Sequence, residues 1–128
     1  MIYLDTSVLL ARLFAEDRFP PDRLWAQTLV ASRLLQYEVF NRVHARGAAA
    51  THLKDARRLL DRVSWLEMTP QVLARALEPF AEPVRTLDSL HLSSMDFLRA
   101  HGQMVSLASY DRRLSQAALS MGFALETV

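Results

Sequence analysis

"MIYLDTSVLL" (residues 1–10) directs the interpretation of the whole chain, because it places an acidic side chain inside an apolar run. The apolar residues around Asp5 predict a short buried strand over 2–5 that leads directly into a helix. Burying an unpaired carboxylate costs several kcal/mol or more. Asp5 is therefore expected either to cap the helix that follows or to belong to a functional site.

The size and composition of the chain indicate one globular domain, residues 1–128. The sequence has no cysteine, which excludes a disulfide framework and a thiolate zinc site and favours a reducing, cytoplasmic location. No basic stretch precedes the first apolar run, and no apolar run reaches membrane-spanning length, so we expect neither a secretory signal nor a membrane anchor.

The net charge of the chain does not by itself indicate a nucleic-acid-binding protein, because its formal value is only +1. Arginine outnumbers lysine fourteen to one, a bias that we treat as neutral. Hydrophobic residues make up 51% of the chain, which leaves room for an exposed apolar surface and favours a homodimer or another protein partner.

Apolar segments of strand type alternate with helical segments along the chain. The predicted strands are 2–5, 29–32, 64–68, 103–109 and 123–128. The predicted helices are 6–15 (begun by Thr6 or Ser7), 21–29, 33–47, 51–63, one beginning at Pro70, 86–102 and 110–122. This alternation predicts parallel βαβ units and hence an α/β three-layer sandwich, with a parallel sheet of four to five strands flanked by helices.

Four acidic residues fall where such a sheet binds ligands, outside the carboxyl ends of its strands near the topological switch point. Asp5 and Asp111 each end a predicted strand, and Glu38 and Asp88 lie near the starts of helices that face the same edge. Each has an ordinary structural explanation when taken alone. Asp5 or Asp111 would cap a helix, Asp88 would interact with a helix dipole, and Glu38 would pair with Arg42.

Together, these residues (Asp5, Glu38, Asp88 and Asp111, called here the four acids) are harder to explain structurally. Clustered carboxylates repel one another and raise one another's pKa values unless a cation neutralises them. Hard oxygen ligands without cysteine or a histidine pair favour Mg²⁺ or Mn²⁺ over zinc. A pocket of carboxylates around such ions is a known solution for hydrolysing phosphodiesters.

Four motifs, in this order and at this spacing, resemble the PIN-domain ribonucleases, and most closely the VapC-type toxins of bacterial toxin–antitoxin pairs. The motifs are "MIYLDTSVLL", "YEVFNRV", "RTLDSLHLSS" and "SYDRRL". The resemblance covers essentially the whole chain. It implies a sheet with strand order 3-2-1-4-5, an endoribonuclease activity, an RNA substrate and a cognate antitoxin.

The resemblance also assigns roles to residues. It implies that the four acids are catalytic and bind Mg²⁺ or Mn²⁺, and that Thr6 and Ser109 support the site with their hydroxyls. Water activated by the cation would attack the RNA phosphodiester in line with the leaving 3′ oxygen. Arg112 and Arg113, which directly follow Asp111, are candidates to contact an RNA phosphate.

Other polar residues are interpreted structurally. A basic stripe of Lys54, Arg58 and Arg62 is better explained as a solvated helix face than as an RNA track. His91 lies one turn after Asp88, and we expect it to be packed and hydrogen-bonded rather than a metal ligand.

Two other fold families with a strand-end aspartate do not fit. A phosphotransfer receiver needs a lysine late in the chain, and the only lysine is Lys54. A haloacid-dehalogenase-type phosphatase needs a second acid two residues after the first, where Ser7 stands. The alternatives that remain are a standalone PIN-type RNA-processing nuclease and a PIN-like binding module without catalysis.

Overall fold

Five short strands pair in parallel, in the order β3-β2-β1-β4-β5, in the computed structural model, which describes residues 1–128. The strands are β1 (Ile2–Leu4), β2 (Leu29–Ser32), β3 (Val63–Leu66), β4 (Ser106–Ala108) and β5 (Ala124–Leu125). Tyr3 in the central strand lies opposite Val30 on one side and Leu107 on the other. The parallel sheet and its strand order are confirmed.

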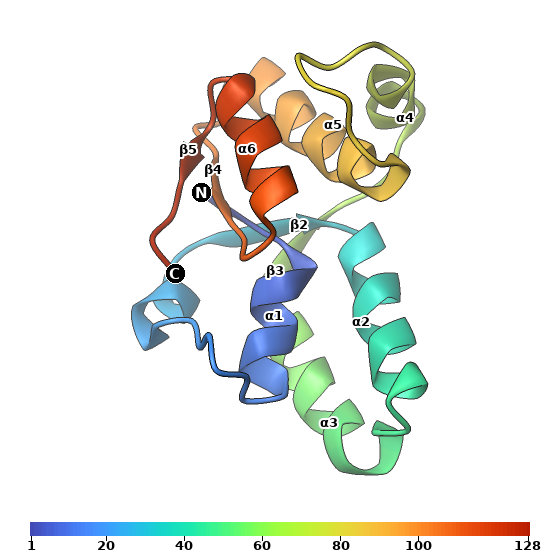
Figure 1. The fold of residues 1–128 in the computed structure, drawn as a ribbon, viewed down its shortest axis with the longest axis vertical. Helices are drawn as coiled ribbons and strands as arrows, with labels where there is room; N and C mark the ends of the chain where they lie inside the picture. The colour runs from blue at the N-terminus through green and yellow to red at the C-terminus, as the bar shows by residue number, and fades with distance from the viewer.

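Helices connect the strands and cover both faces of the sheet (Figure 1). They are α1 (Thr6–Leu13), the 3₁₀ helix η1 (Asp22–Ala26), α2 (Leu34–Ala45), α3 (Ala49–Leu60), α4 (Pro70–Ala76), α5 (Thr86–Ala100) and α6 (Arg112–Ser120). None of them combines the length and the apolar character that a membrane crossing requires.

Side-chain alternation in the strands builds two hydrophobic cores, one on each face of the sheet. Ile2 and Leu4 of β1 point into the core that contains the buried residues of α1, α2 and α3. Tyr3, between them, points into the opposite core, with residues of α5 and α6 such as Leu92 and Leu114. The sheet is therefore the middle layer of a three-layer sandwich, and the predicted fold class is confirmed.

The predicted elements differ from the structure mainly at their ends. The segment predicted as a helix over 21–29 is only a 3₁₀ helix, and its last residue already belongs to β2. The strand predicted over 123–128 pairs over only two residues, because β5 is an exposed edge strand that meets β4 alone. At the carboxyl edge of the sheet, β1 and β4 end side by side, with Leu4 opposite Ala108.

The predicted start of the first helix is confirmed, because Thr6 is the first residue of α1 and Asp5 is its N-cap residue. Asp5 therefore both ends β1 and caps α1, and capping does not remove it from the carboxyl edge of the sheet.

Candidate active site

Asp5 is buried at the carboxyl end of β1 and uses one carboxylate oxygen for all of its hydrogen bonds. Its Oδ2 accepts from the Ser7 backbone N–H at 3.4 Å, from the Ser7 hydroxyl, and from the Ser109 hydroxyl at 2.8 Å. No hydrogen bond in the structure uses Oδ1. The strand and the three donors hold the carboxylate in place and leave one oxygen unused.

Asp111 shows the same division between its two oxygens at the start of α6. Its Oδ1 accepts from the backbone N–H groups of Arg113 at 2.9 Å and Leu114 at 3.2 Å, which are unpaired donors of the first helical turn. The backbone N–H of Asp111 donates to Ser109 Oγ at 2.9 Å. Ser109 therefore connects Asp111 to Asp5, and Oδ2 of Asp111 makes no hydrogen bond.

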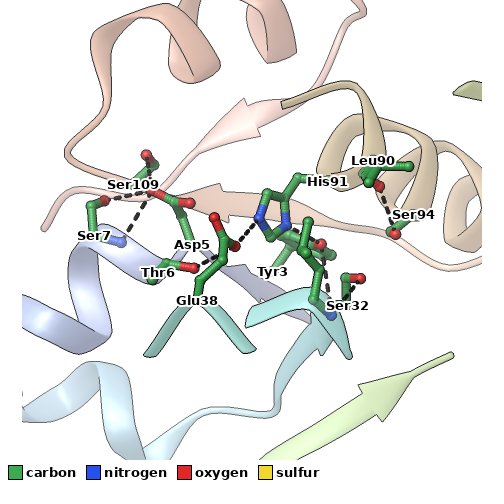
Figure 2. Close-up of polar contacts among 11 residues, drawn as sticks. Tyr3, Asp5, Thr6, Ser7, Ser32, Glu38, Leu90, His91, Ser94 and Ser109 are labelled. Atoms are coloured by element: carbon green, nitrogen blue, oxygen red, sulfur yellow. Dashed lines mark hydrogen bonds and ion pairs between the residues drawn. The ribbon is translucent and has the colours of Figure 1, made fainter. Parts of the chain in front are cut away.

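Glu38 reaches the same edge from α2 and is bound by side chains from two other helices. Thr6 Oγ1 donates to Glu38 Oε1 at 2.9 Å, and His91 Nε2 lies 2.7 Å from the same oxygen. Figure 2 shows the Glu38 carboxylate between Thr6 and His91, with Asp5 nearby. Oε2 of Glu38 makes no hydrogen bond, so Glu38 also keeps one oxygen unused.

Asp88 differs from the other three acids, because its side chain makes no hydrogen bond to the protein. It lies half-buried in the first turn of α5. Burial raises the pKa of Asp88 above the ordinary carboxyl value, and the negative charges of Asp111 and Asp5 raise it further against the opposing charge of Arg85. Asp111 and Asp5 are therefore near enough to Asp88 to act on its charge.

The donor set fits a hard divalent cation, although the side chains do not form a finished coordination shell. No group of three or more acidic or histidine side chains lies close enough together to enclose an ion as the structure stands. Three of the four acids nevertheless present one oxygen without a hydrogen bond, and the fourth presents two. Neighbouring carboxylates repel one another, and a bound cation relieves this repulsion. Carboxylate oxygens without hydrogen bonds are also the ligands that Mg²⁺ and Mn²⁺ prefer.

Two residues that were not among the predicted site residues are connected to Glu38. His91 contacts Glu38 directly, and Tyr3 contacts His91. His91 is 2% exposed, and its Nδ1 lies 2.8 Å from the hydroxyl of Tyr3, which is fully buried. Burial alone would lower the pKa of His91, but the hydrogen bond with Glu38 and the charges of Glu38, Asp5 and Asp88 raise it. The expectation that His91 is packed and hydrogen-bonded agrees with these contacts, but its partner is one of the four acids.

Basic side chains lie beside Asp88. A pocket of about 620 Å³ is lined by Asp88 together with Arg85, Arg112 and Arg113. Arg85 is a further basic residue that the sequence analysis missed; its position three residues before Asp88 was the available signal. The predicted basic stripe does not lie on one helix, because Arg62 follows the end of α3; Arg58 forms an ion pair with Asp55 and Arg62 donates to the carbonyl of Trp25, so both have partners within the protein.

Comparisons with known proteins agree with this fold and its motifs. The family model described as "PIN domain" matches residues 2–119. Ribonuclease VapC46 of Mycobacterium tuberculosis (strain ATCC 25618 / H37Rv) is 32% identical over 97% of this chain and 95% of its own length. Ribonuclease VapC47 of the CDC 1551 / Oshkosh strain is 29% identical over 96% of this chain and 93% of its own length.

A solved structure has the same fold at lower sequence identity. The crystal structure of Mycobacterium tuberculosis VapC20, a protein described as a sarcin-ricin loop cleaving toxin, superposes with a TM-score of 0.68. The two chains are 21% identical, and the superposition covers 91% of this chain and 95% of the other.

Proposed function

This chain belongs to the PIN-domain family, and we propose that it is a metal-dependent endoribonuclease in which the four acids hold Mg²⁺ or Mn²⁺. The main observation behind the proposal is that the two oxygens of three of the carboxylates differ in their hydrogen bonds. Asp5, Glu38 and Asp111 each give one oxygen to protein donors and keep the other for a ligand. Two relatives that are named ribonucleases and match nearly the whole chain support RNA as the substrate.

The proposed chemistry assigns each group a limited task. When bound, a divalent cation lowers the pKa of coordinated water and stabilises the negative charge that develops on the phosphate. Asp5 and Asp111 are held by a strand end, a helix start and Ser109, and each keeps one oxygen for a ligand. No side chain needs to form a covalent bond to RNA, because the carboxylates act by placing the cation.

Positive charge beside the four acids supports an RNA substrate. Arg112 and Arg113 are exposed at the start of α6, and with Arg85 they line the pocket that contains Asp88. Guanidinium groups bind phosphate oxygens through paired hydrogen bonds. We therefore propose that these arginines contact phosphates that flank the scissile bond, while Thr6 and Ser109 support the carboxylates.

We further propose that the protein acts in the cytoplasm as the toxin of a toxin–antitoxin pair and forms a homodimer. The resemblance to VapC-type toxins supports a cognate antitoxin. Exposed leucines on α4, at its C-cap and at the start of α5 offer apolar surface of the kind that protein partners bury: Leu73, Leu77 and Leu87. Light scattering would test the dimer, and expression in a bacterial host should arrest growth only while Asp5 is intact.

A cleavage assay on purified protein tests the enzymatic proposal. We expect RNA cleavage that EDTA stops and added Mn²⁺ restores, and that Asp5→Asn and Asp88→Asn abolish while leaving the protein folded. Unchanged cleavage in both variants would defeat the proposal. Metal-independent cleavage by the wild-type protein would defeat it as well.

Asp96→Asn is the matched control for Asp88→Asn. Asp96 lies on the same helix but pairs with Arg75 and Arg99, both at 2.7 Å, away from the four acids. This variant should cleave RNA at the wild-type rate at a temperature at which it remains folded.

A further inference from the structure

A buried series of hydrogen bonds runs from the backbone of β2 to the carboxylate of Glu38 (Figure 2). The Ser32 backbone N–H donates to the Tyr3 hydroxyl oxygen at 3.1 Å. The Tyr3 oxygen lies 2.8 Å from His91 Nδ1, and His91 Nε2 lies 2.7 Å from Glu38 Oε1. Tyr3, Ser32 and His91 are all buried, so water does not compete for the two contacts of the Tyr3 hydroxyl, whereas Glu38 is partly exposed.

The direction of the series follows from its last acceptor. An ionised carboxylate can only accept, so His91 Nε2 carries a hydrogen and donates it to Glu38 Oε1. A neutral imidazole with its hydrogen on Nε2 accepts at Nδ1 from the Tyr3 hydroxyl, whose oxygen also accepts from the Ser32 backbone N–H. The doubly protonated imidazole also donates from Nε2. Only the neutral form with its hydrogen on Nδ1 would break the contact, by placing a lone pair of Nε2 against the carboxylate.

The consequence for Glu38 is a fixed orientation. Glutamate is among the side chains that lose most rotamer freedom on ordering, about 1.5–2 kcal/mol. Thr6 from α1 and His91 from α5 both hold Oε1, so the carboxylate is already ordered before any ligand binds. The oxygen that remains for a ligand is Oε2.

We propose that Tyr3 and His91 are positioning residues that hold Glu38 ready to bind the divalent cation. The inference rests on the proposed function, because it assigns these residues a task at the proposed metal site. Partners that orient metal ligands in this way typically contribute a factor of 10 to 100 in metal affinity. A purely structural role predicts instead that substitutions change stability and leave metal affinity alone.

Mn²⁺ affinity, measured by calorimetric titration of the purified protein without RNA, separates the two roles. Tyr3→Phe removes one oxygen and keeps the ring, and we expect Mn²⁺ binding about tenfold weaker. Tyr110→Phe is the matched control, because the Tyr110 hydroxyl is buried but makes no hydrogen bond. It should leave the Mn²⁺ affinity at the wild-type value.

Two replacements of His91 make the test specific to Nε2. The amide nitrogen of His91→Gln takes the place of Nε2 and retains a donor for Glu38, so affinity should fall no more than about threefold. His91→Asn provides an amide only at the place of Nδ1, and we expect affinity to fall by tenfold or more. Equal affinities in the wild type, Tyr3→Phe and His91→Asn would overturn the inference and leave the proposed function standing.

Nitrogen NMR of the metal-free wild-type protein reports which ring nitrogens of His91 carry a hydrogen, and the measurement requires no variant. We expect His91 with a hydrogen on Nε2, and a neutral ring with its hydrogen on Nδ1 would overturn the inference. Failure of the wild-type protein to bind Mn²⁺ at all would overturn the proposed function itself, and the inference with it.

Discussion

Replacing Asp88 by asparagine should reduce the stability that Mn²⁺ adds without lowering the stability of the metal-free protein. Asp88 has no hydrogen-bond donor, and its raised pKa reflects burial and the neighbouring charge of Asp111. A carboxyl group whose pKa is higher in the folded than in the unfolded state destabilises the fold when ionised. This destabilisation is fully present above the folded pKa and disappears below the ordinary value of 3.8.

The direction of this pKa shift predicts how the metal-free Asp88→Asn and wild-type proteins compare in stability. At pH 7 the metal-free Asp88→Asn protein should melt at or above the wild-type temperature, and the difference should shrink as the pH falls towards 4. Asp96→Asn should behave in the opposite way. Although burial opposes it, hydrogen bonds from Arg75 and Arg99 lower the pKa of Asp96, so its stabilisation is present above the ordinary carboxyl pKa and is lost as the pH falls. Its removal should lower the stability at pH 7 by about 1 kcal/mol.

The effect of metal has a definite size. Mn²⁺ at 100 times its dissociation constant adds about 2.7 kcal/mol to the unfolding free energy. An unfolding entropy of about 2.1 cal/mol/K per residue, over 128 residues, converts this into a rise of about 10 °C in melting temperature. If losing the Asp88 carboxylate weakens binding tenfold, the gain at the same Mn²⁺ concentration falls to about 1.4 kcal/mol, or about 5 °C.

Calorimetric melting of the wild type, Asp88→Asn and Asp96→Asn, each with and without Mn²⁺, measures all of these quantities. Asp96→Asn should keep the full gain of about 10 °C from a lower starting temperature. If the Asp88→Asn protein kept the full rise in melting temperature with Mn²⁺, Asp88 would not be a metal ligand. If it melted well below the wild type without metal, the Asp88 carboxylate would not destabilise the metal-free fold.

Three further predictions test separate parts of the structure. Asp111→Ala should be about 1 kcal/mol less stable than Asp111→Ser in urea denaturation, because serine still caps α6, while both lose RNA cleavage. In an Asp88→Asn background that binds RNA without cutting it, Arg112→Ala and Arg113→Ala should each reduce the slope of log affinity against log salt by about 1 in filter binding; an unchanged slope would exclude phosphate contacts. Gly122→Ala, at a φ of 87° after α6, should cost about 1–2 kcal/mol in thermal melting and leave the cleavage rate at 20 °C unchanged.

Much of the fold could be predicted from the sequence because local patterns and fold rules agree. Apolar segments alternating with amphipathic helices predicted the parallel sheet, and Gly47 and Gly122 end helices in the left-handed region, as their positions indicated. The order of the strands came from the family resemblance. The helix predicted over 21–29 is shorter in the structure and of the 3₁₀ type, because the two prolines at 20 and 21 mark where a helix can begin without fixing how many turns follow.

The candidate site could be predicted only in part. The rule that ligands bind at strand ends identified Asp5 and Asp111, since both belong to the local sequence of a strand end. The contact between Tyr3 and His91 joins residues 88 positions apart, and it depends on β1 and α5 packing in the same core. No local pattern carries that information. For the same reason, the choice of Glu38 Oε1 rather than Oε2 as the acceptor could be read only from the packed structure.

The most direct test of the central claim is an anomalous difference map from crystals of this protein soaked in Mn²⁺. We predict a Mn²⁺ peak among the four acids, with oxygens of Asp5, Glu38, Asp88 and Asp111 in or next to its coordination shell. A map without a peak there, at a Mn²⁺ concentration that supports RNA cleavage in solution, would contradict the account.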